Sequence, residues 1–96
     1  MQREPAVYIL ASKLRGTLYI GVTSNPPQRI SEHKTDAREG FTKKYNVKTL
    51  VDIEHFPTMR EAIAREKQMK KWRRAWKIEL IEKDNPEWKD LWQDFP

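Results

Sequence analysis

The sequence contains no cysteine, no internal repeat and no low-complexity tract. Without cysteine there can be no disulfide bond and no thiolate metal site. No apolar run approaches the roughly 20 residues that a membrane-spanning helix requires. Residues 1–5 also lack the apolar segment of a secretory signal. These absences predict a cytoplasmic protein with no membrane partner.

The length, 96 residues, is that of one domain with a modest core. We expect this domain to span residues 1–96, with its core over about 6–83 and a C-terminal packing helix over about 86–95. Four tryptophans add to such a small core, because each of them covers a large area.

The net charge of +5 and a pI near 9.6 favour a polyanionic partner. The charge is also uneven, since residues 65–77 include seven basic side chains and one acid, whereas residues 79–94 are rich in acids. Such polarity suits a surface that follows a phosphate backbone, although a solvated helix face is the alternative explanation. Charge alone therefore leaves nucleic-acid binding open, because many small basic proteins bind no polyanion.

Three strands are expected. Residues 6–11 and 18–22 are apolar and rich in β-forming side chains, and the polar segment 12–17 between them predicts a hairpin loop. A third, half-buried strand is predicted over residues 47–54, with one side formed by Val47, Thr49, Val51 and Ile53.

The hairpin contains two tyrosines. Because side chains alternate along a strand, antiparallel pairing can bring Tyr8 and Tyr19 to the same side of the sheet. Gly21 shares a face with Tyr19, so we expect it to leave space beside that ring.

The first helix is predicted to begin after Asn25, which suits the N-cap, with Pro26 at the first helical position. Arg29 and His33 are four residues apart and should share a face of this helix. A loop at Gly40 is expected to expose Lys43, Lys44 and Tyr45.

A second helix should begin at the capping box formed by Thr58 and Glu61. Its inward stripe is predicted to contain Met59, Ala62, Ile63 and Met69. One acid, Glu66, interrupts that stripe. A further helical segment, continuous or after a short break, runs to Trp76, Leu80 and Ile81. Core packing is expected for Trp88, Leu91, Trp92 and Phe95.

The position of Glu66 has a chemical consequence. Burying an unpaired carboxylate is costly, so an inward glutamate needs a partner. That partner could be a nearby Arg or Lys, which would make Glu66 structural. It could instead be a hard cation, because Mg²⁺ is often held by one or two carboxylates together with waters and substrate phosphates.

The other candidate site residues are Tyr8, Tyr19, Arg29 and His33. The two tyrosines could be simple sheet aromatics, and Arg29 and His33 could be solvated helix residues. A phenol titrates near about 10, so it needs a nearby cation to act as a base at neutral pH. An arginine could hold a phosphate and stabilise its developing charge, and a histidine could transfer a proton.

Nucleic-acid contacts are predicted for exposed basic and aromatic side chains. These are Lys34, Lys43, Lys44, Tyr45, Lys67, Lys70, Lys71 and Arg73. Trp72 and Trp76 could stack on bases, but their helical spacing favours packing in the core.

Together these residues resemble the GIY-YIG endonuclease superfamily, specifically its small single-domain bacterial members. The two tripeptides of the family correspond to Val7-Tyr8-Ile9 and Tyr19-Ile20-Gly21, the first without the usual glycine-isoleucine. Arg29, His33, the stretch 40–45 and Glu66 within 64–72 are further matches. The resemblance covers residues from about 6 to 92, and the order and spacing of these motifs are more specific than any one of them.

The resemblance implies an α/β (α+β) fold with a three-stranded antiparallel sheet flanked by helices. It also implies phosphodiester hydrolysis with one Mg²⁺ or Mn²⁺ ion. On this resemblance we predict DNA as the partner, with RNA as an alternative, and a monomer or weak homodimer. Glu66 would bind the metal, Tyr19 would activate the attacking water, Tyr8 would position water or phosphate, Arg29 would hold the phosphate, and His33 would share the proton transfer. Sequence specificity should be low and cleavage structure-selective, because the chain has little room for a recognition module.

The sequence departs from the family at Val22, where many relatives have a lysine. This motivates two alternatives to an active nuclease. One is a nucleic-acid-binding module that has lost catalysis. The other is a protein-interaction domain whose aromatic segment 88–95 docks on a larger repair or mobile-element protein.

Overall fold

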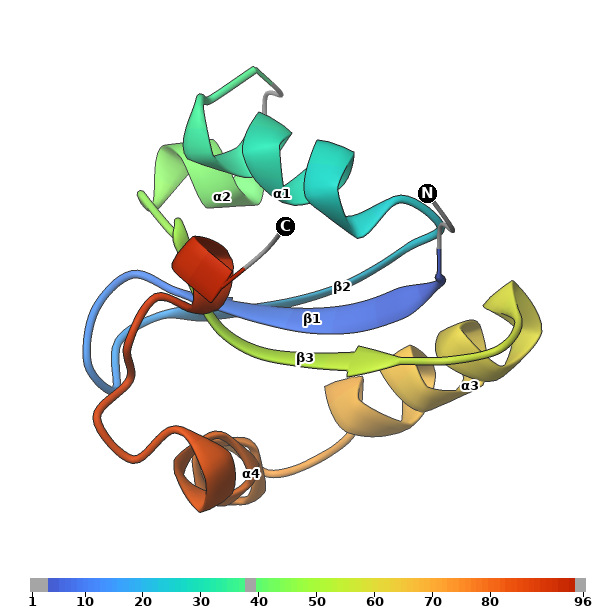
Figure 1. Cartoon of the computed structure of the whole chain (residues 1–96). Coiled ribbons are helices and arrows are strands. Elements are labelled where there is room, and N and C mark those ends of the chain that lie inside the picture. The colour runs from blue at the N-terminus through green and yellow to red at the C-terminus, as the bar shows by residue number, and fades with distance from the viewer. Residues whose placement is uncertain (1–3, 38–39, 95–96) are drawn as a thin grey trace.

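The computed structural model describes residues 4–37 and 40–94. Its fold is α+β, with a three-stranded antiparallel sheet in the order β2-β1-β3 (Figure 1). The elements are β1 (Ala6–Ala11), β2 (Leu18–Thr23), α1 (Pro26–Lys34), α2 (Phe41–Lys44), β3 (Thr49–His55), α3 (Met59–Lys70), α4 (Arg74–Asp84) and the 3₁₀ helix η1 (Leu91–Asp94). No helix among the described residues is long and apolar enough to cross a bilayer.

Helices cover both faces of the sheet. In Figure 1, α1 and α2 lie on one side together with η1, and α3 and α4 lie on the other. Strand β1 is therefore enclosed by β2 and β3 at its edges and by helices above and below. Every residue of β1 is buried as a result, which explains why its sequence is continuously apolar rather than alternating.

The alternation of side chains along β1 divides the core into two layers. The layer under α1 contains Tyr8 and Leu10 together with Ile30, Val47 and Leu50. The layer over α3 and α4 contains Val7, Ile9, Ala11, Ile20, Val51, Ala62, Met69, Ile81 and Trp88. A residue's position in the sheet thus decides which group of helices it contacts.

The prediction that Val51 and Ile53 share one side of the third strand is wrong. The register between β1 and β3 shifts at Ile9 and Leu10, so that Val51 is an extra residue in β3. Such a bulge interrupts the alternation. Val51 consequently belongs to the layer over α3, whereas Ile53 packs against the layer under α1.

Gly21 makes room for Tyr8 rather than for Tyr19. The two residues are direct partners in the β1–β2 register. A Cβ atom on Gly21 would lie 2.4 Å from both Cζ and Oη of Tyr8. The absence of a side chain at this position therefore leaves room for the Tyr8 ring beside the Gly21 backbone, which corrects the expected neighbour of the glycine.

The predicted helix starts are confirmed. The Asn25 side chain accepts a hydrogen bond from the backbone N–H of Gln28 at the start of α1, and Thr58 does the same for Glu61 in α3. The segment expected as a loop after Gly40 instead contains the single helical turn α2, which leaves Lys43 and Lys44 exposed as predicted.

The inward stripe of α3 is only partly as expected. Ala62 and Met69 are buried, but Ile63 is 37% exposed and lies outside the stripe. Residues 62, 66 and 69 follow the spacing of one helix face, and the side chain of Glu66 is 14% exposed between the two buried neighbours. The prediction that Glu66 interrupts the inward face is therefore confirmed.

The helix expected over residues 86–95 does not form. Trp88 has φ 56°, a left-handed conformation that ends a right-handed helix. Only the turn Leu91–Asp94 is helical, as a 3₁₀ helix. Asn85 replaces the missing helical bonds, because its amide donates to the carbonyls of Val51 and Lys89 and accepts from the backbone N–H of Lys89.

The aromatic C-terminal segment packs inside the molecule. Trp88 is 6% exposed and its indole N–H donates to Glu82. Leu91 and Trp92 pack against the layer under α1. Phe95, expected to join them, lies outside the described residues. The segment thus covers the sheet, which removes the structural basis for treating Trp88 as an exposed docking residue.

Candidate functional site

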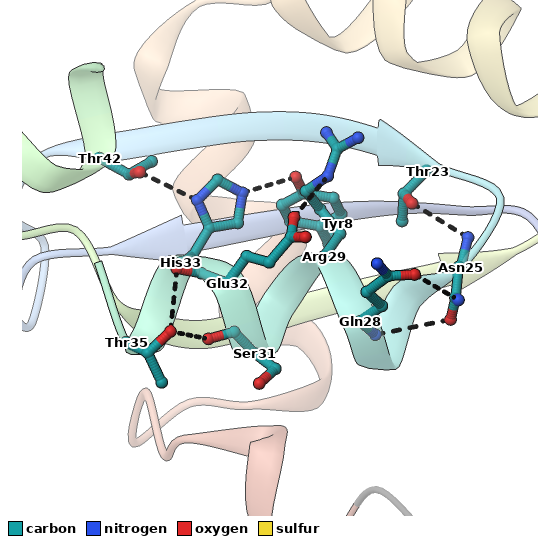
Figure 2. Close-up of polar contacts among 10 residues, drawn as sticks. All are labelled: Tyr8, Thr23, Asn25, Gln28, Arg29, Ser31, Glu32, His33, Thr35 and Thr42. Carbon is teal, nitrogen blue, oxygen red and sulfur yellow. Dashed lines mark hydrogen bonds and ion pairs between the residues drawn. The ribbon is translucent and has the colours of Figure 1, made fainter. Parts of the chain in front are cut away.

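Three rings from three elements meet on the α1 side of the sheet. Oη of Tyr8 is 2.9 Å from Nε2 of His33, within hydrogen-bonding distance (Figure 2). The ring of Tyr19 lies 6.3 Å from that of Tyr8 and 5.5 Å from that of His33, measured between centroids. We call Tyr8, Tyr19 and His33 the three-ring cluster.

The strand register explains why the two tyrosines meet. Tyr8 pairs with Gly21 and Leu10 pairs with Tyr19, so the tyrosines are diagonal neighbours on the same face. The prediction that both tyrosines point to one side of the sheet is confirmed. Tyr8 is fully buried, whereas Tyr19 is only half-buried because β2 is an edge strand.

His33 also contacts α2. Its Nδ1 is 2.9 Å from the hydroxyl of Thr42, a residue that is 6% exposed. A neutral imidazole donates from one nitrogen and accepts at the other. Tyr8, His33 and Thr42 therefore form a hydrogen-bonded chain in which one hydroxyl donates to the neutral ring and the other accepts from it. When the imidazole is protonated, both nitrogens donate and both hydroxyl oxygens accept.

Thr42 was not predicted from the sequence as part of the site. It lies next to Phe41 in a stretch whose residues gave no periodic signal. Thr42 belongs to the site because α2 packs against α1 and brings its hydroxyl to His33. The spacing of residues along the chain does not reveal this contact. The motif resemblance over 40–45 was the one available indication.

Arg29 lies one helical turn before His33 on α1, as the spacing predicted. Its Nε is 3.6 Å from a carboxylate oxygen of Glu32, and Figure 2 shows this ion pair next to the His33 ring. The Arg29 side chain is 34% exposed. A partly exposed guanidinium beside a histidine can reach a bound anion, provided that it releases or shares Glu32.

Glu66 lies on the opposite side of the sheet from the three-ring cluster. Its helix neighbours Ala62 and Met69 belong to the layer over α3. Its carboxylate is 3.1 Å from Nζ of Lys70, one turn further along α3. Helix α3 packs against β2, the edge strand that contains Tyr19. Any common ligand of Glu66 and Tyr19 must therefore pass around that edge.

The donor set limits the kind of metal that the site could bind. Within residues 4–37 and 40–94, no three His, Cys, Asp or Glu side chains form a group able to enclose an ion. Glu66 alone offers one half-buried carboxylate. That arrangement fits Mg²⁺ or Mn²⁺, which can be held by one carboxylate with waters and substrate phosphates as the remaining ligands.

The predicted nucleic-acid contacts differ in their availability. Exposed side chains are those of Lys43, Lys44, Tyr45, Lys67, Lys70, Lys71 and Arg73. Lys70 also forms an ion pair, with Glu66, but its side chain stays 52% exposed. Lys34 differs because it is half-buried, with an ion pair to Asp90 and a hydrogen bond to the carbonyl of Lys48. Its charge is neutralised within the fold, so Lys34 fastens α1 to the C-terminal segment rather than offering a free cation.

A buried acid that the sequence analysis did not identify lies on β3. Asp52 is 8% exposed and one of its oxygens has no hydrogen-bond partner. Burial raises the pKa of Asp52 to about 7, with smaller effects from Glu54 and Asp84. The nearby ion pair between Arg65 and Glu54 joins α3 to β3. This group lies on the α3 side of the sheet and is separate from the three-ring cluster.

Comparisons with known proteins are consistent over most of the chain. A family model described as the GIY-YIG catalytic domain matches residues 4–79. A UPF0213 protein from Syntrophus aciditrophicus is 39% identical over 82 residues, covering 84% of this chain and 92% of that protein. A UPF0213 protein from Staphylococcus haemolyticus is 36% identical over 76 residues, covering 79% of this chain and 92% of that protein.

A solved structure is also similar. The solution NMR structure of a UPF0213 protein from Bacillus halodurans has a TM-score of 0.58 and 28% sequence identity. The match covers 91% of this chain and 92% of that one. The sheet and its flanking helices therefore correspond to an experimentally known architecture.

Proposed function

The chain belongs to the GIY-YIG family, and on that premise we propose that it is a divalent-metal-dependent endonuclease that hydrolyses phosphodiester bonds of DNA. Its sequence specificity would be low, because phosphate contacts position a protein without reading the bases. Structure-selective cleavage is the form of activity that suits a domain of this size.

The observation that carries the proposal is the three-ring cluster with its hydrogen bond of 2.9 Å between Tyr8 and His33. Hydrolysis requires a group that takes a proton from water and a group that stabilises charge on the phosphate. Tyr19, the half-buried member, is the proposed general base, and His33 shares the proton through its contacts with Tyr8 and Thr42. Tyr8 positions the water or phosphate.

Arg29 is proposed to hold the scissile phosphate. A guanidinium can donate two parallel hydrogen bonds to phosphate oxygens. Arg29 now pairs with Glu32 at 3.6 Å, a distance longer than a good hydrogen bond. The monoanionic phosphodiester of the substrate would compete for that guanidinium, so substrate binding and loss of the Arg29–Glu32 pair should occur together.

Glu66 is the proposed metal ligand. A bound Mg²⁺ or Mn²⁺ ion would supply Lewis-acid stabilisation of the phosphate and lower the pKa of a nearby water. To accept the ion, Glu66 would release Lys70, whose side chain is 52% exposed and can turn toward solvent or substrate. The substrate backbone would then run along the edge of β2, between the Tyr19 side and the Glu66 side.

The proposal is tested by replacing Glu66 with an uncharged residue of the same shape. Wild-type protein should cleave at least one of duplex, flap, branched or single-stranded DNA with Mn²⁺. Glu66→Gln should lower that rate by about 100-fold or more, while DNA binding in EDTA stays unchanged. The matched control is Glu79→Gln, an exposed glutamate of α4. Cleavage by the Glu66→Gln variant at the wild-type rate would exclude Glu66 from the mechanism.

A second candidate function is a DNA-binding module without catalysis. Val22, half-buried on β2, occupies the position where many relatives have a lysine, so one cation that could assist a phenol is missing. This alternative predicts salt-sensitive binding with no cleavage of any of the four substrates in Mg²⁺ or Mn²⁺. Cleavage that depends on Glu66 would exclude it.

A further inference from the structure

An aromatic row extends from the three-ring cluster to the surface of α2. The ring of Tyr19 stacks against that of Phe41, with centroids 6.1 Å apart and planes 28° apart. Phe41 in turn contacts Tyr45, with centroids 4.8 Å apart. Phe41 and Tyr45 are one helical turn apart, which explains their contact. The row therefore connects a half-buried tyrosine of the candidate site with two outer rings.

The two outer rings are not part of the core. Phe41 is 45% exposed and Tyr45 is 48% exposed. In the same turn of helix, Thr42 is buried and bonded to His33. Helix α2 is thus held to the cluster by Thr42, while its rings face outward beside Tyr19. Phe41 and Tyr45 are tilted by 48° to one another, and such an exposed pair of rings at the border of a polar site can receive a flat ligand.

The charges around the row indicate the kind of ligand. Nζ of Lys44 lies 5.4 Å from the centroid of the Tyr45 ring. Lys43 is exposed on the same short helix. Flat rings accompanied by cations match a molecule that has planar groups and phosphates in one chain. An apolar peptide segment would gain nothing from the two lysines.

We propose that Phe41 and Tyr45 form a stacking platform for unpaired bases of single-stranded DNA, next to the phosphate that Arg29 would hold beside the three-ring cluster. The proposal rests on the proposed function and extends it by naming the substrate: a strand whose bases beside the scissile phosphate are unpaired. In a duplex the bases stack on one another and their faces are not available to a side chain, whereas in a flap or single strand they are.

The test is a binding measurement that needs no catalysis. The probes are a short fluorescent oligothymidylate and an abasic strand of the same length, which has the same phosphates and no bases. Fluorescence anisotropy in EDTA gives the two dissociation constants. Wild-type protein should bind the oligothymidylate at least about ten-fold more tightly than the abasic strand.

The variants separate stacking from charge. The double variant Phe41→Leu/Tyr45→Leu stays apolar and should lose the preference for bases while its affinity for the abasic strand remains unchanged. Phe41→Trp should retain the preference. Lys44→Gln should weaken binding to the two probes by the same factor. Leu14→Ala is the control, because Leu14 is 63% exposed in the β1–β2 loop and remote in sequence from α2. Thermal unfolding of each variant verifies that it is folded.

Equal wild-type affinity for the two probes would overturn the platform, and so would a preference for bases that survives in the folded double variant. Neither result depends on cleavage. If the preference for bases requires Phe41 and Tyr45 but no substrate is cut in Mg²⁺ or Mn²⁺, the platform stands and the nuclease proposal fails. If cleavage occurs without any preference for bases, the platform alone fails.

Discussion

Tyr8 is at once a core side chain and a candidate reactive group. It is fully buried, yet its hydroxyl meets His33 at 2.9 Å. A buried hydroxyl without a partner would be costly, so the pairing contributes to stability as well as to chemistry. At the scale of single residues, the same side chain therefore serves the core and the candidate site. A substitution of Tyr8 should change both the stability and the proposed activity.

Gly21→Ala should damage the site without touching a reactive atom. The added methyl would lie 2.4 Å from Cζ and Oη of Tyr8, so the ring must move or the strands must separate. We expect a loss of about 1–3 kcal/mol in unfolding free energy, together with reduced cleavage. Denaturant unfolding measures the first effect. Wild-type stability in this variant would show that Tyr8 does not depend on the glycine for its position.

Asp52→Asn tests the pH dependence of stability. Burial raises the folded-state pKa of Asp52 from 3.8 to about 7. The folded state then holds more protons than the unfolded state between about pH 4 and 7, so stability falls as pH rises through this window. The amide removes that dependence. At pH 8 the variant should be more stable than wild type by about 4 kcal/mol, and at pH 4 nearly equal.

Thermal or denaturant unfolding at several pH values measures this difference. The control is Glu87→Gln, whose carboxylate is 74% exposed and should leave the pH profile unchanged. A variant of Asp52 that follows the wild-type profile at every pH would mean that the buried carboxyl is ionised at little cost.

At the scale of elements, local signals predicted most of the fold. The apolar runs of β1 and β2, the caps Asn25 and Thr58, and the proline after Asn25 each act within a few residues. They correctly predicted two strands and the starts of α1 and α3. The same local signals placed both tyrosines on one face, because alternation along a strand is itself a local property.

What the sequence could not predict depends on contacts between distant elements. The bulge at Val51 leaves no compositional mark, so the alternation of β3 was misread. Trp88 is left-handed and buried, with its backbone N–H bonded to Asn85 and its indole N–H bonded to Glu82, and the helical spacing of the apolar residues did not reveal this turn. The partner of Glu66 is a local exception: Lys70 is four residues further along the same helix, and the sequence offered several nearby cations to choose from.

Asn85→Ala should release the C-terminal segment from the sheet. The Asn85 side chain is buried and bonds to Val51 and Lys89, tying the chain after α4 to β3. Removing these bonds leaves buried backbone groups without partners, at a cost of about 2–4 kcal/mol. Hydrogen exchange should become faster in residues 85–92 first. Unchanged exchange in this segment would show that apolar contacts alone hold it.

At the scale of the whole molecule, the basic side chains fall into two groups: those paired with an acid of the fold, and those exposed to solvent. Lys34 is neutralised by Asp90, and Arg65 by Glu54. Lys44 projects from α2 beside Tyr45. A count of basic residues in the sequence does not distinguish these two groups, because ion pairs between distant elements decide which cations remain available for phosphates.

Salt dependence of DNA binding tests this division. Each lysine that contacts a phosphate of a single strand adds about 0.7 to the slope of log affinity against log salt. Lys44→Gln should reduce the slope by about that amount, with unchanged stability. Lys34→Gln should leave the slope unchanged and lower the stability. The reverse pattern would mean that Lys34 exchanges Asp90 for DNA.

The most direct test of the central claim compares two tyrosines by single-turnover cleavage of single-stranded or flap DNA in Mn²⁺. Tyr19→Phe keeps the ring but removes the proposed base, and Tyr45→Phe removes an equivalent hydroxyl outside the three-ring cluster. Tyr19→Phe should lower the rate constant by about 100-fold or more, whereas Tyr45→Phe should cleave like wild type. A Tyr19→Phe variant that cleaves at the wild-type rate would exclude Tyr19 as the general base.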